Sequence, residues 1–428
     1  MAITTFKQLQ EEFAKVFIIA DDGILKLLMA TIIGNQLSSN AIWIMIVGAS
    51  ASGKSEYISS LNKLDKIICP ISDLTVNTLA SGSRQFGKET SLLHKLPIGA
   101  VFAFKDFTSM VSKNREAKTE ILAQLREVYD GEFVKRTGTG DDIKWKGKVG
   151  AIAGSTEVVF EHLEDLSAMG DRFILYSMKM PDRMEVARRV LFNSKDMGEK
   201  RDHLQNCVKE FIDYTMSKMV KDVDLVLSHE VEERLLQVAD FSTKVRSGVI
   251  MDERNKSLVR FVPSSELPTR VTGQFYALAR GFIAMGQSDE ERKVKKGELT
   301  DEEIAILYQI AFDSIPIKRR MALHALAKYK GGVATKGLAT SLNYQTVVVN
   351  GWMAQLNSLG ICHRVKKGNS DVWSLNEKYR KIISEYEHIN PVEESLEDDE
   401  IPEIDEDFGD FTKAAEEYDQ GFNQIANQ

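Results

Sequence analysis

A glycine-containing loop between an apolar run and a helical segment carries the clearest chemistry in the chain. Residues 48–55 read G-x-x-x-x-G-K-S, and the apolar residues 41–47 before them form a run short enough for a buried strand. This is the spacing of a phosphate-binding loop, whose backbone N–H groups surround phosphate oxygens at the start of a helix. Lys54 would neutralise phosphate charge, and the Ser55 hydroxyl would coordinate Mg²⁺. The alternative is a glycine turn without a ligand, which is disfavoured because every fixed position is filled.

The loop therefore predicts that the chain binds ATP with Mg²⁺, and an acidic residue farther along supports this. The residues expected to contact the nucleotide are Gly48, Ala49, Ser50, Ala51, Ser52, Gly53, Lys54, Ser55 and Glu56. The apolar stretch 97–104 leads to Asp106, in the layout of a Walker B element. An aspartate at the carboxyl end of a buried strand beside the loop can hold the water shell of Mg²⁺. Apolar residues followed by an acid are common, so the weight of this signal comes from its place after the loop.

Most ATPases of this layout follow that aspartate with a glutamate that polarises the attacking water, and this chain departs from the pattern. Phe107 and Thr108 occupy those positions. Glu116 and Glu120 lie on the helix expected next and could supply the carboxylate. They could equally be surface charges on an amphipathic helix. The sequence leaves open which residue replaces the glutamate.

A basic hairpin is expected between residues 132 and 148. Two alternating runs flank a glycine and aspartate turn, which is typical of paired antiparallel strands. Five basic residues lie on it, with Trp145 among them: Lys135, Arg136, Lys144, Lys146 and Lys148. Alternating bases with an aromatic residue suit contact with a nucleic-acid backbone. A solubilised hairpin whose tryptophan packs inward explains the same pattern, and the sequence does not decide between the two.

A winged helix is expected between residues 316 and 375. Helices over 318–329, 335–342 and 345–359 are followed by two strands around a basic turn. In such a fold the second and third helices form the pair that enters a major groove. The residues expected to face bases are Gln345, Thr346 and Asn350, and those expected to meet phosphate are Lys366 and Lys367. Some winged helices serve only protein contacts, but the local charge favours DNA.

The charge of the chain is divided sharply. The net charge is −8, yet residues 391–428 hold fourteen acids and one base, so the other 390 residues carry +5. Residues 316–381 hold twelve bases and two acids, a net of +10. A basic module before an acidic tail indicates a polyanionic partner, and the tail is expected to be disordered.

The remaining composition is that of a cytoplasmic protein. No apolar run is as long as a membrane span, and the start of the chain lacks the features of a signal peptide. Cys69, Cys207 and Cys362 are scattered without metal-ligand spacing, so reduced thiols are expected.

Together these segments resemble the AAA+ ATPases, and within them the helicase group that includes the minichromosome-maintenance proteins. The resemblance implies an α/β fold: an AAA+ parallel sheet with a helical lid, followed by a winged-helix domain and a disordered acidic tail. The expected divisions are a helical lead-in at 1–40, a P-loop core at 41–180, a lid and connector at 181–312, the winged helix at 313–381 and the tail at 382–428.

The resemblance also implies roles for several residues. Asp106 looks like the Walker B aspartate, and Ser155 or Thr156 would take the sensor 1 position, where the family usually has asparagine. Arg172 is similar to an arginine finger, which would act on the nucleotide of a neighbouring subunit. Arg270 resembles sensor 2. The basic hairpin is similar to the pre-sensor hairpin that grips DNA inside a ring.

Two functions follow as hypotheses. The first is an ATP-driven DNA motor: a ring-forming, hexameric replicative helicase or an initiator of a phage or mobile element, with other replication proteins recruited through the acidic tail. The second is a DNA-binding regulator that uses ATP as an assembly switch and hydrolyses it slowly, which Phe107 in the glutamate position favours.

Overall fold

The computed structural model describes residues 2–19, 21–79, 84–85, 88–89, 91–136, 142–162, 172–180, 182–219, 225–255, 258–286, 296–368 and 370–390. The tail at 391–428 and the residues 170–171 before the expected arginine finger lie outside these ranges, as does the hairpin turn at 137–141. Within the described ranges, no helix combines the length and apolar character that crossing a bilayer requires.

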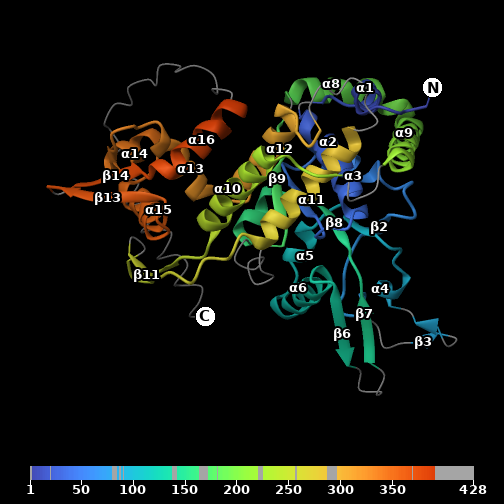
Figure 1. Ribbon diagram of the computed structural model, residues 1–428, viewed down its shortest axis with the longest axis horizontal. Coiled ribbons are helices and arrows are strands. Elements are labelled where there is room, and N and C mark those ends of the chain that lie inside the picture. Colours follow the sequence, from blue (N-terminus) through green and yellow to red (C-terminus); the bar gives the residue numbers. More distant parts are fainter. Residues whose placement is uncertain are drawn as a thin grey trace, which may run out of the picture. The chain divides into compact units, whose positions relative to one another are not determined.

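A five-stranded parallel sheet forms the centre of the fold (Figure 1). Its order is β2 (Ile68–Ile71), β5 (Val101–Phe104), β8 (Gly150–Ser155), β1 (Trp43–Val47) and β9 (Ile174–Ser177). The expected strands are confirmed, and β8 is inserted between β1 and β5. Val47 pairs with Ser155 on one side and Ser177 on the other. The carboxyl ends of these strands therefore meet at one edge of the sheet.

Alternating side chains of β1 enter two different hydrophobic cores, one on each face of the sheet. Ile44 and Ile46 belong to the core that includes α2 (Asp22–Gln36) and α11 (Thr269–Gly286). Trp43, Met45 and Val47 belong to the other, which includes α6 (Arg115–Tyr129). Helices α2 and α11 approach closely at Gly281. A Cβ built on this residue would lie 2.3 Å from the Ala30 carbonyl oxygen. Only glycine permits this contact.

The other elements of the first 313 residues are short strands and helices around this sheet. The helices are α1 (Phe6–Val16), α3 (Lys54–Ser59), α4 (Leu92–Lys95), α5 (Thr108–Val111), η1 (Glu157–His162), α8 (Arg183–Asn193), η2 (Ser194–Asp196), α9 (Met197–Lys218), α10 (His229–Arg246) and α12 (Asp301–Asp313). The small antiparallel pairs are β3 (Arg84–Gln85) with β4 (Lys88–Glu89), β6 (Glu132–Arg136) with β7 (Asp142–Lys146), and β10 (Ile250–Met251) with β11 (Val259–Phe261). Both helices expected at 1–40 and the expected hairpin are confirmed.

The carboxyl-terminal elements follow the order expected for a winged helix. They are α13 (Ile317–Ala327), β12 (Val333–Ala334), α14 (Thr335–Leu342), α15 (Thr346–Ser358), β13 (Cys362–Lys367), β14 (Ser370–Leu375) and α16 (Glu377–Ile389). The three expected helices and two expected strands are all present, and β12 adds a third strand in the order β12-β14-β13. Arg319 of α13 donates to the carbonyl oxygens of Val245 and Ser247, which fastens this helix to the end of α10.

The expected start of the tail at residue 382 is wrong, because it falls inside α16. Ile382 and Ile383 are buried, and the Tyr386 ring stacks on Phe312 of α12 with centroids 3.9 Å apart. Apolar residues at this helical spacing bind α16 to the core before the acidic composition begins. Residues 382–389 therefore belong to the folded part of the chain.

Candidate functional site

The expected phosphate loop, residues 48–55, follows β1 directly and turns through two residues with left-handed backbone. Ala51 has φ 63° and Gly53 has φ 93°, and Gly53 precedes the first residue of α3. Nothing lies within 4 Å of a Cβ built on Gly53, so the backbone conformation rather than space calls for glycine there. The Gly48 N–H donates to the Ser155 carbonyl, 3.2 Å away, which ties the loop to the neighbouring strand β8.

Lys54 is buried and bonded to its own loop. Its Nζ donates to the carbonyl oxygens of Gly48 (2.8 Å) and Ala49 (2.6 Å) and to Ser52 Oγ (3.1 Å). Burial lowers the pKa of Lys54, and the negative charges of Asp106 and Glu157 oppose this. The loop thus holds an ammonium group among backbone oxygens, within the field of two carboxylates.

Polar side chains meet at the carboxyl edge of the sheet because β1, β5 and β8 are parallel. Asp106 accepts from the Thr108 N–H over 2.9 Å. The Thr108 hydroxyl lies 3.2 Å from Ser155 Oγ and 3.3 Å from Thr156 Oγ1. The structure therefore brings together Lys54, the candidate Walker B residue and both candidates for sensor 1. The side-chain oxygen atoms of Asp106, Ser155 and Thr156 are ligands of the kind that Mg²⁺ prefers.

The place expected for a catalytic glutamate holds an aromatic core residue. Phe107 is fully buried, and its ring packs against Phe104 and Phe173 with centroids 5.3 and 5.2 Å away. Glu116 and Glu120 are exposed on α6. The carboxylate that acts on Lys54 besides Asp106 is Glu157, in the turn after β8, and sequence analysis missed it. Its position right after Ser155 and Thr156 was the available signal.

A cavity of about 670 Å³ opens beside the loop and has an apolar wall. The end of α1 contributes Val16, and Phe17 and Ile18 follow it. The other lining residues are Ser50 to Tyr57, Met178, Met180, Arg183, Val186, Arg189, Val190, Met197 and Arg201. The size is ordinary for a small-molecule site, and an apolar wall beside a phosphate loop suits a nucleotide base. The amino-terminal lead-in therefore lines the cavity besides packing on the core.

Arg201 joins the distant helix α9 to the phosphate loop. Its Nε donates to Glu56 Oε2 over 2.8 Å, and hydrogen bonding to Glu56 raises the pKa of Arg201. Arg201 also lines the cavity, together with Arg183 and Arg189 of α8. Sequence analysis missed these three arginines, because they come from helices far along the chain and follow no local motif.

The two arginines expected to assist catalysis lie together at the amino edge of the sheet. Arg172 is 7% exposed, and its Nη2 donates to both carboxylate oxygens of Asp130, 2.9 and 2.6 Å away. Burial lowers the pKa of Arg172, Asp130 opposes this, and the charge of Arg270 lowers it further. Arg270 binds Glu266 over 2.5 Å.

The position of this pair follows from its neighbours. Trp43, the first residue of β1, contacts the rings of Tyr129 and Phe173, and Arg172 lies over Tyr129. The phosphate loop lies at the opposite, carboxyl edge. Neither arginine lines the cavity beside the loop, so the structure does not bring them to the expected phosphate site of the same chain.

The β6–β7 hairpin turns only part of its basic set outward. Phe133 and Ile143 are buried on one face, where Trp145 packs against the core. Lys135 lies on that face and its Nζ contacts the Val76 carbonyl at 3.3 Å. Lys148 donates to the Leu37 carbonyl at 2.7 Å.

The opposite face of the hairpin carries Arg136, Lys144 and Lys146, all exposed. Lys146 pairs with Glu132 over 2.7 Å, and Lys144 lies 4.0 Å from Asp142. Three of the five expected contact residues are therefore available for a nucleic acid on this face.

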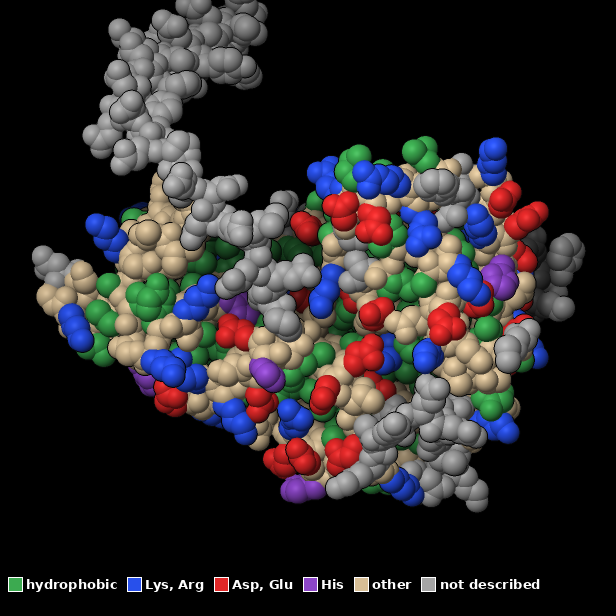
Figure 2. All heavy atoms as spheres, turned by 90° about the horizontal axis from the view of Figure 1, so that it is seen from above, with side chains coloured by type: hydrophobic (Ala, Val, Ile, Leu, Met, Phe, Trp, Pro, Cys, Tyr) green, Lys and Arg blue, Asp and Glu red, His purple; other side chains and the backbone are tan. Residues whose placement is uncertain are grey.

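In the expected winged helix, the start of α15 is exposed and uncharged. Gln345 and Thr346 are exposed, as is Val347, which is 69% exposed. Asn350 is half-buried, and its Oδ1 has no hydrogen-bond partner among the described residues. The exposed Lys366 and Lys367 lie on β13, in the wing. Over the face of the molecule seen in Figure 2, basic and acidic side chains are interspersed.

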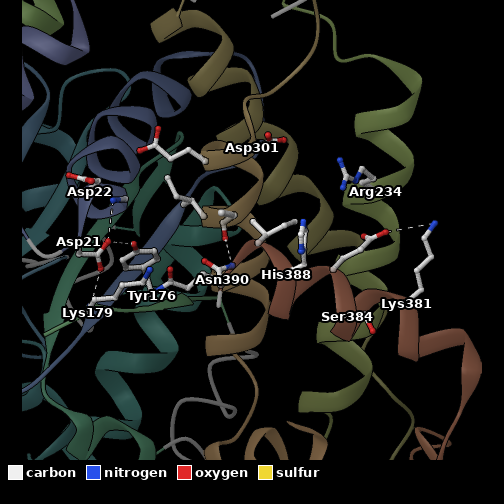
Figure 3. A pocket seen from close by; sticks show the side chains of 17 residues that line it. Asp21, Asp22, Tyr176, Lys179, Arg234, Asp301, Lys381, Ser384, His388 and Asn390 are labelled. Carbon is white, nitrogen blue, oxygen red and sulfur yellow. Dashed lines mark hydrogen bonds and ion pairs between the residues drawn. The ribbon is translucent and has the colours of Figure 1, made fainter. Parts of the chain in front are cut away.

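A second cavity, of about 930 Å³, shares no lining residue with the first. Asp21 lines it and accepts hydrogen bonds from the Tyr176 hydroxyl (2.6 Å) and the Lys179 N–H (2.9 Å), as Figure 3 shows. Burial raises the pKa of Asp21. Side chains of both charges face this cavity, including Asp301 and Arg234. No residue expected from the sequence to act in a site lines it.

The chain was compared with protein families, curated sequences and solved structures. No protein-family model matches the chain, and no curated protein sequence does. Among solved structures, the chain is similar to one described as "SCCmec type IV Cch - active helicase", with 11% identity and a TM-score of 0.33. The match covers 90% of this chain and 72% of the other.

Proposed function

We propose that this chain is an ATP-dependent DNA motor of the AAA+ type, a ring-forming replicative helicase or initiator. The observation that supports it best is the carboxyl edge of the sheet, where Lys54, Asp106 and Ser155 come together beside a cavity with an apolar wall. This edge combines a cation for phosphate, oxygen donors for Mg²⁺ and a wall for the base.

Ser55 and Asp106 would hold Mg²⁺, which would neutralise charge on the phosphates. Ser55 lines the cavity and both residues are exposed, so both oxygens are accessible. Lys54 would exchange the carbonyl oxygens of its own loop for phosphate oxygens. Glu157 is the acid that we propose in place of the missing glutamate, because its charge already acts on Lys54.

The positions of Arg172 and Arg270 support an assembly of several subunits. Both lie at the edge of the sheet opposite the phosphate loop, so they would act on nucleotide bound by a neighbour. For this, Arg172 must exchange the Asp130 carboxylate for a phosphate. A closed ring, hexameric in our proposal, provides such a contact at every interface.

DNA would meet two basic surfaces. The outer face of the β6–β7 hairpin carries Arg136, Lys144 and Lys146, and the wing carries Lys366 and Lys367. Hydrolysis would move the hairpin along a strand while the winged helix guides the duplex. The acidic tail at 391–428 would recruit other replication proteins.

The test is ATP hydrolysis with and without single-stranded and duplex DNA, using Lys54→Ala as the control for the site. Stimulation by DNA that Lys54→Ala abolishes would support the motor. If Glu157→Gln then lowers turnover while nucleotide binding is unchanged, Glu157 replaces the missing glutamate. Hydrolysis that Lys54→Ala leaves intact would contradict the nucleotide site itself.

A second function is favoured by the buried Phe107, which leaves the usual glutamate position without an acid. In this alternative, the chain is a DNA-binding regulator that assembles on ATP and hydrolyses it slowly. It predicts tight ATP binding and ATP-dependent oligomers, with negligible turnover on any DNA. Binding to duplex DNA would then depend on sequence and on Gln345 and Asn350.

A further inference from the structure

Three side chains with metal-binding atoms meet where α1 packs against α9. They are Glu12 of α1 and His203 and Cys207 of α9, and their ligand atoms all lie within 4.8 Å of one another. His203 Nε2 lies 2.9 Å from Glu12 Oε2 and 3.5 Å from Cys207 Sγ. We propose that this cluster is a zinc-type metal site that ties α1 to α9.

Two packed helices, not a loop, hold the three residues in place. His203 and Cys207 are four residues apart on α9, so they lie on the same helix face, one turn apart. Glu12 is brought to them by the docking of α1, where the rings of Phe6 and Phe211 pack edge to face with centroids 6.3 Å apart. The Ile3 N–H also donates to Glu210 Oε2 over 3.2 Å.

One of the donor separations matches that of a tetrahedral zinc site. Bonds of about 2.0 to 2.3 Å from zinc place neighbouring donors roughly 3.3 to 3.7 Å apart. The separation of 3.5 Å between His203 Nε2 and Cys207 Sγ falls in that range. Glu12 Oε2 lies 2.9 Å from His203 Nε2, at hydrogen-bond distance, so a bound metal would take the place of this hydrogen bond.

The chemical types of the three ligand atoms indicate which metals the cluster would bind. A thiolate, an imidazole and a carboxylate suit Zn²⁺ and its neighbours in the transition series, whereas Mg²⁺ and Ca²⁺ prefer oxygen donors alone. Glu12 Oε1 is held by Lys15 Nζ at 2.5 Å, which leaves Oε2 to face the cluster. Such outer hydrogen bonds orient ligands in many metal sites.

Burial indicates a site that is closed on one side and open on the other. Cys207 is 4% exposed, whereas the His203 side chain is 56% exposed. The thiol therefore forms the floor, and the imidazole forms the rim. Three protein ligands leave a fourth position for water or another ligand, as in metal sites that keep an open coordination position.

A metal here would fix two walls of the first cavity. Val16 at the end of α1 lines that cavity, as do Met197 and Arg201 of α9. The cluster lies between these helices, so a bound metal would restrict their relative movement.

Cobalt is the direct probe of this site, because Co²⁺ replaces Zn²⁺ and has visible absorption. The full chain, stripped of metal by a chelator, is titrated with Co²⁺ alone. We expect one equivalent to bind, with a thiolate-to-cobalt charge-transfer band and the absorption of tetrahedral cobalt, and Zn²⁺ should displace it. Cys207→Ser should abolish the band, whereas the matched control Cys69→Ser, on β2, should retain it.

His203→Ala provides a variant that keeps the core, because this side chain is largely exposed. It should weaken Co²⁺ binding about tenfold or more. Loss of a residue that only hydrogen-bonds a metal ligand already lowers metal affinity about tenfold, and loss of a ligand should lower it at least as much. Zn²⁺ should raise the Tm of the wild type but not that of His203→Ala. No band in the wild type, or a band that survives both Cys207→Ser and His203→Ala, would overturn the proposal. If Cys207→Ser does not fold, His203→Ala decides alone.

Discussion

Arg201 donates its Nε–H to Glu56 Oε2 over 2.8 Å, and this contact joins α9 to the helix that begins in the phosphate loop. Glu56 follows Ser55, the expected Mg²⁺ ligand, and Arg201 lines the cavity beside them. The guanidinium therefore lies next to the place expected for phosphate oxygens. Its pairing with Glu56 holds it there before any nucleotide binds.

Arg201→Ala should lower nucleotide affinity at least about tenfold, because a charged hydrogen bond to phosphate contributes about 1.5 to 3 kcal/mol. Its effect on the free energy of unfolding should be below about 1 kcal/mol, since the pair is partly exposed. Titration with a fluorescent nucleotide measures the first, and denaturant unfolding the second. Lys63→Ala is the matched control: Lys63 pairs with Asp202 of α9 over 2.5 Å but does not line the cavity. Equal losses of affinity in both variants would contradict a direct role for Arg201.

Lys54→Met should weaken nucleotide binding without unfolding the protein. The ammonium group is lost from the phosphate site, so affinity should fall roughly 10- to 100-fold. Burial lowers the pKa of Lys54, which means that the folded chain holds its charged form at a cost. Removing the buried charge therefore stabilises the fold, whereas losing its hydrogen bonds to Gly48 and Ala49 destabilises it. The free energy of unfolding should therefore change by less than about 1 kcal/mol. A large drop in Tm would show that the loop depends on Lys54 for its own structure.

Local patterns predicted the elements whose parts are close in the sequence. The phosphate loop, its flanking strand and the winged helix each depend on spacing within a few dozen residues. Other contacts join segments that are far apart in the sequence, so no local pattern indicates them. Examples are the pairing of Arg201 with Glu56 and the cluster of Glu12 with His203 and Cys207. The prediction for the cysteines compared their spacing with one another, whereas His203 lies four residues from Cys207 on the same helix.

One correction was within reach of the sequence. Side chains alternate between the two faces of a strand, so Lys135 shares a face with the apolar Phe133 rather than with Arg136. Applied to the hairpin, this rule would have separated the inward lysine from the outward ones. The inward packing of Trp145 follows in the same way, because it pairs with Phe133.

The two kinds of hairpin lysine should behave differently. Lys144→Ala with Lys146→Ala should weaken binding to single-stranded DNA and lower its dependence on salt, because both lie on the outer face. Lys148→Ala should instead lower the free energy of unfolding by about 1 kcal/mol, since its bond to the Leu37 carbonyl is lost, and leave DNA binding intact. Binding isotherms at several salt concentrations measure the first effect and denaturant unfolding the second. Unwinding that survives the double substitution would contradict the role of the hairpin as the moving element.

The wing should bind phosphate without reading sequence. Lys366→Ala with Lys367→Ala should weaken duplex binding about equally for all sequences and reduce the salt slope by about 2. The matched control is Lys378→Ala with Lys381→Ala on α16, where both lysines are also exposed. Anisotropy titrations with several duplexes measure both pairs of variants. A loss that depends on sequence, or an equal loss in the control pair, would count against the wing as a phosphate contact.

Arg172 and Lys54 should complement each other between subunits. Arg172→Ala and Lys54→Ala should each be inactive alone, because one lacks the finger and the other the phosphate contact. In a ring mixed at equal amounts, about one interface in four pairs an intact loop with an intact arginine, so hydrolysis should return to about a quarter of the wild-type rate. Arg172→Ala should also cost about 1 to 3 kcal/mol of unfolding free energy, because Asp130 loses its partner. Arg172→Lys separates the two roles of Arg172. It keeps a positive charge beside Asp130, but its shorter side chain reaches less far toward a neighbouring subunit. Recovery on mixing requires that the arginine act across an interface, whereas its failure with two well-folded variants would confine Arg172 to its ion pair with Asp130.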